Sequence, residues 1–259
     1  MQNQDRIWGQ IPPGFRKITD ERGIRLVVRD DQERSVTVRV CRDSASLSDA
    51  RHYQGREPLK FFTLPNGERG LIRAYYHGGT LRKITGQLFF TWPPRPFREL
   101  SITEELRRRG ISTVEVYGAC VETVWGPFYR GWLITRELAE AQDLWVACQS
   151  GMIRELGVSV CLRAVAKSLR ALHNEGVYHR DLNLRNILVR LEPEGVKGYI
   201  IDFDKATLLL SRLPPPLVKK NLNRLLRSAR KLDPDRAYFL PAYWDQLMNF
   251  YHEANGRGV

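Results

Sequence analysis

The pattern of apolar and polar positions changes character about halfway along the chain. In the first half, short runs alternate apolar and polar residues, as half-buried strands do. The predicted strands span residues 24–28, 35–40, 59–64, 71–76, 112–117 and 132–135. The turn-like Asp30-Asp31-Gln32 would join the first two strands, and Pro65-Asn66-Gly67 predicts a hairpin between the next two.

Helical spacing governs most of the second half. One helix is predicted earlier, over 96–109, with Gly110 as its stop signal. Residues 139–149 look helical, residues 158–173 form a strongly amphipathic helix, and the C-terminus is again helical. We therefore predict an α+β protein with two lobes, an antiparallel-sheet lobe over 1–137 and a small helical lobe over 138–259.

The segment that carries chemistry is His179-Arg180-Asp181 followed five residues later by Asn186 and an apolar strand. This order and spacing match the kinase catalytic loop H-R-D-x-x-x-x-N. In such a loop a carboxylate lies beside the acceptor hydroxyl, and an amide oxygen reaches the Mg²⁺ that holds the phosphates. Asp181 is accordingly the candidate catalytic residue and Asn186 a candidate metal ligand. His179 and Arg180 are expected to shape the loop.

A second aspartate follows another apolar run. The run is Ile200-Ile201-Asp202-Phe203-Asp204, and its Asp202 lies sixteen positions after Asn186. It resembles the D-F-G metal site of kinases, with Asp204 in place of the glycine. Losing that glycine removes a flexible position, which argues against a mobile activation switch. Asp202 is the second candidate metal ligand.

The first half is expected to supply the groups that hold the nucleotide. Gly55, between two predicted strands, is a candidate for a turn that covers the phosphates, although it is one glycine where G-x-G-x-x-G has three. Arg73 occupies the strand position of the usual kinase lysine, and Glu99 on the following helix is its natural partner. A surface arginine and a solvated glutamate are the alternative interpretations.

Charge and cysteine usage indicate the class of partner and the cellular compartment. The formal net charge of +12 favours an acidic partner, such as nucleic acid, an anionic lipid or a phosphorylated substrate. The four cysteines have no metal-ligand spacing, so we expect buried free thiols in a reducing cytosol. No apolar run is long enough to span a bilayer. The basic amphipathic stretch 217–233 would lie on an anionic membrane, pack on the lobe with a charged outer face, or do both.

At these motifs the chain resembles the lipopolysaccharide kinase family, most closely its 3-deoxy-D-manno-octulosonic acid (Kdo) kinase branch. The resemblance runs from about residue 53 to residue 232. It is carried by Gln54-Gly-Arg, Asn66-Gly-Glu-Arg-Gly-Leu-Ile-Arg-Ala-Tyr-Tyr, Arg95-Pro-Phe-Arg-Glu-Leu, Leu133-Ile-Thr-Arg-Glu-Leu, His179-Arg-Asp-Leu-Asn-Leu-Arg-Asn-Ile-Leu, Ile201-Asp-Phe-Asp-Lys-Ala and Asn221-Leu-Asn-Arg-Leu-Leu-Arg-Ser. Residues 1–50 match less distinctly.

The resemblance implies a protein-kinase-like fold and an ATP- and Mg²⁺-dependent sugar kinase that phosphorylates Kdo on lipid A. It would act as a peripheral protein on the cytoplasmic face of the inner membrane, with no nucleic acid among its partners. By the same resemblance Asp181 would be the base, Asn186 and Asp202 the metal ligands, and Arg73 with Glu99 the phosphate-side pair.

Three alternatives remain at this point. The acceptor could be heptose of the lipopolysaccharide core. The chain could instead be a minimal kinase of proteins or small molecules. It could also be a kinase-like binding module without catalysis, an interpretation that the arginine at position 73 supports and that the presence of Asp181, Asn186 and Asp202 opposes.

Overall fold

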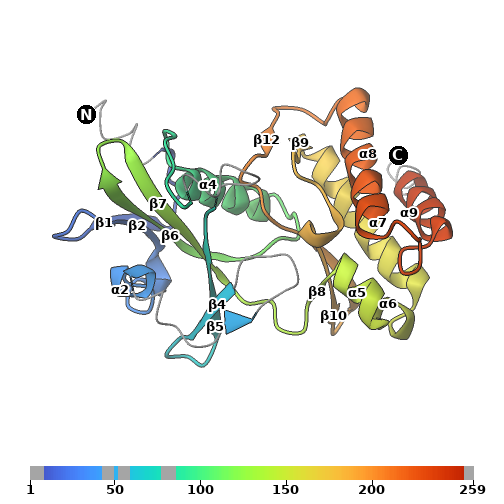
Figure 1. Ribbon diagram of the computed structural model, residues 1–259, viewed down its shortest axis with the longest axis horizontal. Coiled ribbons are helices and arrows are strands. Elements are labelled where there is room, and N and C mark those ends of the chain that lie inside the picture. The colour runs from blue at the N-terminus through green and yellow to red at the C-terminus, as the bar shows by residue number, and fades with distance from the viewer. Residues whose placement is uncertain (1–8, 43–49, 52–58, 77–85, 254–259) are drawn as a thin grey trace. The chain divides into compact units, whose positions relative to one another are not determined.

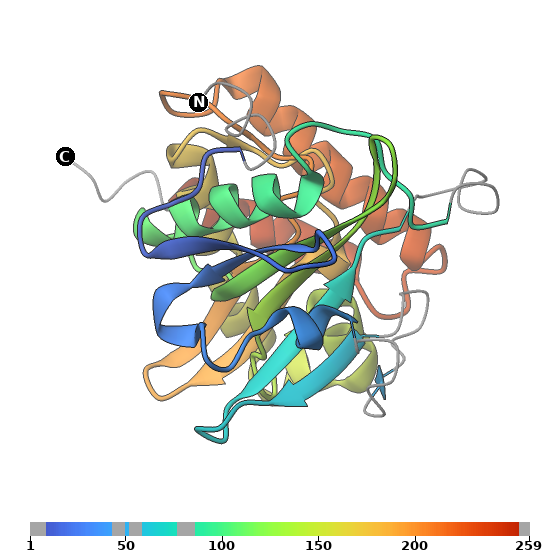
Figure 2. The same cartoon turned by 90° about the vertical axis from the view of Figure 1, so that its left-hand side faces the viewer.

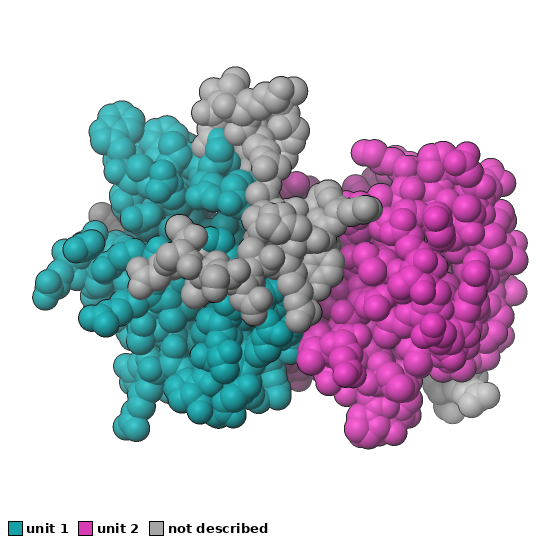
Figure 3. All heavy atoms as spheres, turned by 60° about the horizontal axis from the view of Figure 1, so that its bottom comes forward, with its two compact units in different colours: residues 1–105, 115–137 teal, residues 106–114, 138–259 magenta. Residues whose placement is uncertain are grey.

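The computed structural model describes residues 9–42, 50–51, 59–76 and 86–253. The chain forms two compact units, drawn in separate colours in Figure 3. The first comprises residues 1–105 and 115–137, and the second comprises residues 106–114 and 138–259. Each is described by itself below.

The first unit is built on a seven-stranded antiparallel sheet in the order β1-β2-β6-β7-β5-β4-β3 (Figure 1). Its strands are β1 (Phe15–Thr19), β2 (Arg25–Arg29), β3 (Ala50–Arg51), β4 (Leu59–Thr63), β5 (Arg69–Ala74), β6 (Val116–Trp125) and β7 (Phe128–Arg136). The hairpin predicted at Pro65-Asn66-Gly67 is confirmed, since β4 pairs with β5 and Gly67 adopts the left-handed φ of 82° that such turns need.

Both faces of this sheet are covered because its strands alternate two sets of apolar side chains. Helix α4 (Arg95–Arg108) lies along one face, where Phe97 and Leu100 pack against Val27 of β2 (Figure 2). On the other face, Leu26 and Val28 pack with residues of the segment around helix α2 (Val38–Arg42). Helix α4 and its stop at Gly110, with φ 80°, agree with the prediction.

The prediction of a strand over residues 35–40 is wrong. After β2 the chain forms a short 3₁₀ helix, η1 (Asp30–Gln32), and then α2. The physical reason lies in the pairing of β2, which has β1 on one edge and β6 on the other. Neither edge of β2 is open to a following strand. The segment instead forms a turn and a short helix, from which Val36, Val38 and Val40 pack against the core.

One pair of cysteines also departs from expectation. Cys41 of α2 and Cys120 of β6 form a disulfide, with Cα atoms 6.4 Å apart, so the prediction of free thiols fails for this pair. Cys148 and Cys161 are buried and free, as predicted. Burial raises the pKa of Cys148 to about 12 and also raises that of Cys161, which keeps both thiols protonated and unreactive at pH 7.

The second unit is mostly helical, as predicted. Its helices are α5 (Leu144–Ser150), α6 (Met152–Glu155), α7 (Val158–Asn174), α8 (Pro215–Leu232), α9 (Pro241–Glu253) and the 3₁₀ turn η4 (Leu184–Asn186). Its short strands are β8 (Gln142–Asp143), β9 (Val177–Tyr178), β10 (Ile187–Glu192), β11 (Gly195–Ile200) and β12 (Thr207–Leu208). The α+β class is therefore confirmed. No helix in the described ranges is long and apolar enough to cross a membrane.

Candidate functional site

Two loops of the second unit carry the predicted catalytic and metal-binding residues. The catalytic loop, residues 179–186, runs from β9 to β10, and the metal loop, residues 201–206, runs from β11 to β12. Strand β10 pairs with β11, and β12 pairs with β9. The start of each loop therefore lies beside the end of the other. The N–H of Ile201 donates to the carbonyl of Asn186 at 3.0 Å.

His179 lies at the junction of these two loops. Its Nε2 bonds the carbonyl of Ile201 at 3.0 Å, its Nδ1 accepts the N–H of Asp181 at 3.2 Å, and its ring packs on Phe203. This pattern fits a neutral ring protonated on Nε2. Burial lowers the pKa of His179, so it stays neutral at pH 7. The histidine shapes the loop, as predicted, and does so without carrying charge.

Asp181 is held by its main chain and exposed at its side chain. Its main-chain carbonyl accepts a hydrogen bond from the side-chain Nδ2 of Asn183 at 2.8 Å and another from the side-chain Nδ2 of Asn186 at 2.9 Å. Asn183 in turn caps η4 by accepting the N–H of Arg185. The loop backbone is thus fixed on both sides of Asp181, while the carboxylate reaches solvent. That combination suits a group that must meet an incoming hydroxyl in a set position.

Asp202 follows β11 in an unusual backbone conformation. Its φ is 69°, in the left-handed region that residues other than glycine rarely adopt, and its side chain is half-buried. Such local strain is characteristic of functional positions. Phe203, which follows it, is fully buried against His179, so the backbone around Asp202 is anchored on its C-terminal side as well.

The donor types on these two adjacent loops fit magnesium. Asn186 offers an amide oxygen and Asp202 a carboxylate, and the hydrogen bond between Ile201 and Asn186 ties their loops together. Mg²⁺ prefers oxygen ligands and is commonly bound by one or two protein groups plus water and substrate phosphates. The described ranges hold no cluster of three or more His, Cys, Asp or Glu residues that could bind a metal by themselves.

A residue that the sequence reasoning assigned no role supports the catalytic loop from beneath. Asn221 of α8 is completely buried, and its Nδ2 donates to the carbonyl of His179 at 2.6 Å while its Oδ1 accepts the N–H of the same residue at 3.3 Å. The signal was present in the sequence. Asn221 is in line with Leu225 and Ala229, at four-residue spacing on the apolar face of α8, where a polar side chain needs a partner.

The packing of α8 tests the interpretation of the basic stretch 217–233 as a helix that lies on the lobe. Its apolar side chains are buried in the second unit, with Leu222, Leu225 and Ala229 at most 9% exposed. The interpretation as a helix packed on the lobe is therefore confirmed, with the basic residues left on the outer face. His173 is likewise a packed histidine, as predicted, bonded through Nδ1 to Tyr251 at 2.8 Å.

The first unit contains the predicted phosphate-side pair. Arg73 of β5 and Glu99 of α4 form an ion pair at 2.5 Å, and the Tyr75 hydroxyl bonds the other carboxylate oxygen. Glu99 is only 2% exposed, whereas Arg73 retains 30% of its side-chain exposure. The alternative of a solvated glutamate is excluded. A buried carboxylate that holds a partly exposed guanidinium is suited to presenting positive charge to a phosphate.

Gly55 lies outside the described residues. The strands on either side of the segment 52–58, β3 and β4, pair antiparallel, and β3 replaces the strand predicted over 35–40 as the one that precedes Gly55. Strand β4 is the neighbour of β5, which carries Arg73.

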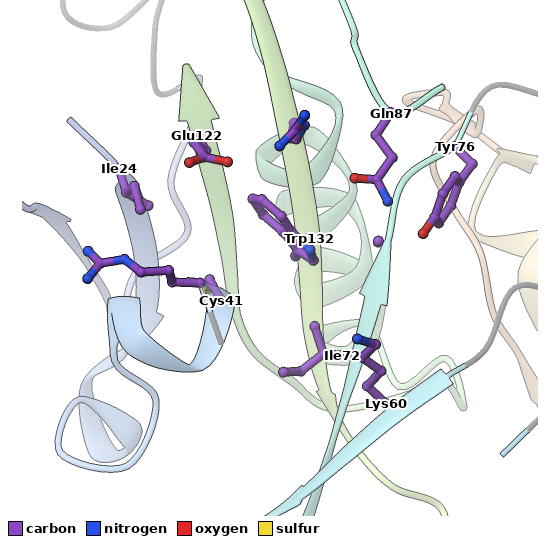
Figure 4. Close-up of a pocket in the computed structure, with 11 residues that line it drawn as sticks. Ile24, Cys41, Lys60, Ile72, Tyr76, Gln87, Glu122 and Trp132 are labelled. Carbon is purple, nitrogen blue, oxygen red and sulfur yellow. The ribbon is translucent and has the colours of Figure 1, made fainter. Parts of the chain in front are cut away.

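A cavity of about 360 Å³ lies on the face of the sheet away from α4. It is lined by Ile72 and Ala74 of β5, which alternate with Arg73, and by Trp132, Glu122 and Gln87 (Figure 4). Because successive residues of a strand point to opposite faces, Arg73 points away from this cavity and toward Glu99. The cavity is therefore separate from the predicted phosphate-side pair.

The sequence profile of the lipopolysaccharide kinase (Kdo/WaaP) family matches residues 47–251. A 3-deoxy-D-manno-octulosonic acid kinase of Pasteurella multocida is 37% identical over 189 residues, which cover 71% of this chain and 76% of that protein. The enzyme of the same name from Mannheimia succiniciproducens is 30% identical, with the same coverage. The one from Vibrio vulnificus is 28% identical over 78% of this chain and 89% of its own.

Among solved structures, WaaP in complex with acyl carrier protein has a TM-score of 0.55 to this chain. The superposition covers 92% of this chain and 89% of that one, at 16% sequence identity. At that identity the likeness shows a shared fold. The family profile covers both loops of the second unit as well as β4, β5 and α4 of the first.

Proposed function

The chain belongs to the lipopolysaccharide kinase (Kdo/WaaP) family, and from that premise we propose that it transfers the γ-phosphate of ATP to a hydroxyl of Kdo attached to lipid A. As a member of this family it is a phosphotransferase that acts on a sugar hydroxyl in lipopolysaccharide core biosynthesis. The observation that carries the proposal is the strand pairing that holds the loops of Asp181, Asn186 and Asp202 side by side.

In this proposal Asp181 is the catalytic base. Its carboxylate accepts the proton of the sugar hydroxyl as that oxygen bonds to the γ-phosphorus and the bond to the bridging oxygen of ADP breaks. The hydrogen bonds from the side-chain amides of Asn183 and Asn186 to the main-chain carbonyl of Asp181 support this role because they fix the backbone and leave the carboxylate unoccupied. His179, neutral and buried, orients the loop and exchanges no proton with the acceptor.

Asn186 and Asp202 would hold Mg²⁺, which supplies charge neutralisation at the phosphates. Arg73, fixed by Glu99, would contact the phosphates of the nucleotide, and Gly55 is proposed for the turn that covers them. The sheet-based part of the chain, 1–137, would thus serve ATP and the helical part, 138–259, would serve catalysis. This division of labour is the two-lobed, protein-kinase-like organisation predicted from the motifs.

We further propose that the protein works as a peripheral protein at the cytoplasmic face of the inner membrane, because its acceptor is anchored there by lipid A. The formal charge of +12 suits a polyanionic glycolipid.

The direct test is to incubate purified protein with Mg·ATP and Kdo-lipid A and to read the product by mass spectrometry. The expected result is a mass gain of one phosphate on the sugar portion, absent when EDTA removes the metal. A parallel reaction offers a heptose-extended acceptor and a generic protein substrate. Phosphate gained only by the heptose or only by the protein would replace Kdo with that acceptor, and no gain on any of them would overturn the proposal.

Substitution of Arg73 tests the phosphate-side pair. Arg73→Met is expected to raise the KM for ATP by about ten- to a hundredfold, the equivalent of one charge-assisted hydrogen bond. It also leaves Glu99 as a buried carboxylate without its cation, so the variant should unfold at a lower temperature. Arg73→Lys keeps the positive charge and should restore the thermal stability and part of the affinity for ATP.

The matched control is Arg69→Met on the same strand, where the arginine pairs with Glu137 at 3.1 Å. That pair is partly exposed, and its loss should cost at most about 1 kcal/mol of stability and leave the KM for ATP unchanged. Equal KM values for wild type and Arg73→Met would remove Arg73 from the nucleotide site.

A further inference from the structure

An aromatic cluster covers the end of the β6–β7 hairpin in the first unit. We call it the aromatic tip and define it as Phe90, Trp92, Val124, Trp125 and Phe128. Four of these side chains are strongly exposed: Trp125 at 74%, Phe90 at 61%, Val124 at 44% and Trp92 at 43%. Isolated exposed apolar residues are ordinary, but a contiguous exposed aromatic group marks an interaction surface.

Three rings of the aromatic tip, those of Trp125, Phe128 and Phe90, are in contact. Trp125 stacks on Phe128, with ring centroids 6.0 Å apart and an interplanar angle of 9°, and Phe90 lies 5.8 Å from Phe128 on its other side. Phe90 is held there because its neighbour Phe89 forms a bridge with Tyr129. The tip is therefore a preformed apolar surface assembled from two segments of the chain.

The tip also projects beyond the strands around it. Strand β2 pairs with β6 only as far as Val121, opposite Arg25, whereas the hairpin continues to the pair Trp125–Phe128. Figure 1 shows the β6–β7 hairpin extending past the end of β2. A narrow projecting tip suits insertion into a soft surface better than docking against a flat protein face.

Basic residues stand behind the aromatic rings. The guanidinium of Arg25 lies over the Trp92 ring at 5.5 Å and bonds the Thr123 hydroxyl at 3.0 Å, while Arg130 is exposed beside Tyr129. Glu122 stands opposite Arg130 in the hairpin, so these three residues leave a net charge of +1. Aromatic rings with arginines one layer behind match a bilayer interface, where rings enter the headgroup region and cations meet lipid phosphates.

We infer that the aromatic tip is the surface through which the protein inserts into an anionic lipid bilayer. The inference rests on the proposed function, because an acceptor anchored by lipid A brings the enzyme to such a bilayer. It differs from the surface considered for α8, where Leu222, Leu225 and Ala229 are buried in the second unit.

The test is co-sedimentation of the full chain with vesicles of phosphatidylethanolamine and phosphatidylglycerol, without nucleotide or acceptor. The double variant Trp125→Ser with Phe90→Ser should lower the vesicle partition coefficient by on the order of tenfold or more, because it removes two large apolar side chains from the interface. Vesicles of neutral phosphatidylcholine should bind wild type more weakly than the anionic ones.

The matched control removes two exposed leucines of the second unit, Leu191→Ser with Leu210→Ser, which are 56% and 110% exposed. This variant should bind vesicles as the wild type does. Equal loss in both double variants, or no loss in the tip variant, would overturn the assignment. Thermal unfolding of each variant confirms that the folded protein was compared.

Fluorescence locates the contact. Lipids brominated near the headgroup should quench wild-type tryptophan emission, and Trp125→Phe should bind as well as wild type but show markedly less quenching. Unchanged quenching in Trp125→Phe would place the contact elsewhere. Light scattering covers the other occupant of an apolar surface, since a wild-type dimer that the tip variant converts to a monomer would assign the tip to self-association.

The outcome is independent of the kinase assay. Vesicle binding needs no turnover, and turnover can be measured on acceptor dispersed in detergent, where the tip variant should retain wild-type kcat. Vesicle binding through the tip together with no phosphorylation of Kdo would leave the surface standing and overturn the acceptor. Phosphorylation of Kdo by a protein whose tip binds no vesicles would do the reverse.

Discussion

Replacing Asp181 with asparagine is expected to lower kcat by about 10²–10⁴-fold, the contribution of a positioned general base. Asparagine has nearly the same shape but cannot accept the proton of the acceptor hydroxyl. The side chain is exposed, and the loop is held through the main-chain carbonyl of Asp181 and not through its carboxylate, so thermal unfolding should be unchanged. The measurement is initial rate at saturating ATP and acceptor, alongside a melting curve.

The control for this variant is Asp235→Asn, which removes an exposed carboxylate from the segment that follows α8. Its kcat should equal that of the wild type. If Asp181→Asn retained wild-type turnover while folded, Asp181 would not be the base. The proton would then pass to solvent or to another group, and the catalytic part of the proposal would fail.

Replacing Asp202 tests the metal loop, and the backbone dictates the choice of variant. Because Asp202 has a φ of 69°, alanine there would add strain of about 1–2 kcal/mol, whereas asparagine tolerates the left-handed region. Asp202→Asn therefore removes the charge while keeping the loop. It should lower the affinity for Mg²⁺ by more than the roughly 10–100-fold that loss of a residue supporting a metal ligand costs, and kcat/KM should fall accordingly.

The measurement is the rate as a function of Mg²⁺ concentration, with Mg·ATP-induced thermal stabilisation as a second readout. High Mg²⁺ should recover part of the activity of Asp202→Asn. Glu194→Gln, in the exposed turn between β10 and β11, is the control and should follow the wild-type curve. A wild-type Mg²⁺ dependence in Asp202→Asn would exclude Asp202 as a ligand.

The catalytic loop could be found in the sequence because its information is local. His179, Asp181 and Asn186 lie within eight positions, so their spacing alone was enough to predict a kinase catalytic loop. The pairing of Arg73 with Glu99 was also predictable, because a strand and the helix that follows it bring the two together and the ion pair is then observed at 2.5 Å.

What the sequence did not reveal depends on positions far apart along the chain. The helix at Val38–Arg42 was taken for a strand because three valines at alternate positions suit either structure, and the pairing of β2 with β6 decided between them. The disulfide joins Cys41 to Cys120 across 79 positions, and no local pattern announces it. Asn221 supports His179 from 42 positions away.

The strand pairs that flank the two loops also limit where the length of this chain can vary. An added residue in the catalytic loop or the metal loop would shift the register of β9 with β12 or of β10 with β11. The turn that joins β10 to β11 carries no such constraint, because Pro193 and Glu194 are exposed and lie beyond the last strand pair, Glu192–Gly195. A reporter peptide or affinity tag inserted between Pro193 and Glu194 would therefore leave both loops in place and label the enzyme without disturbing them.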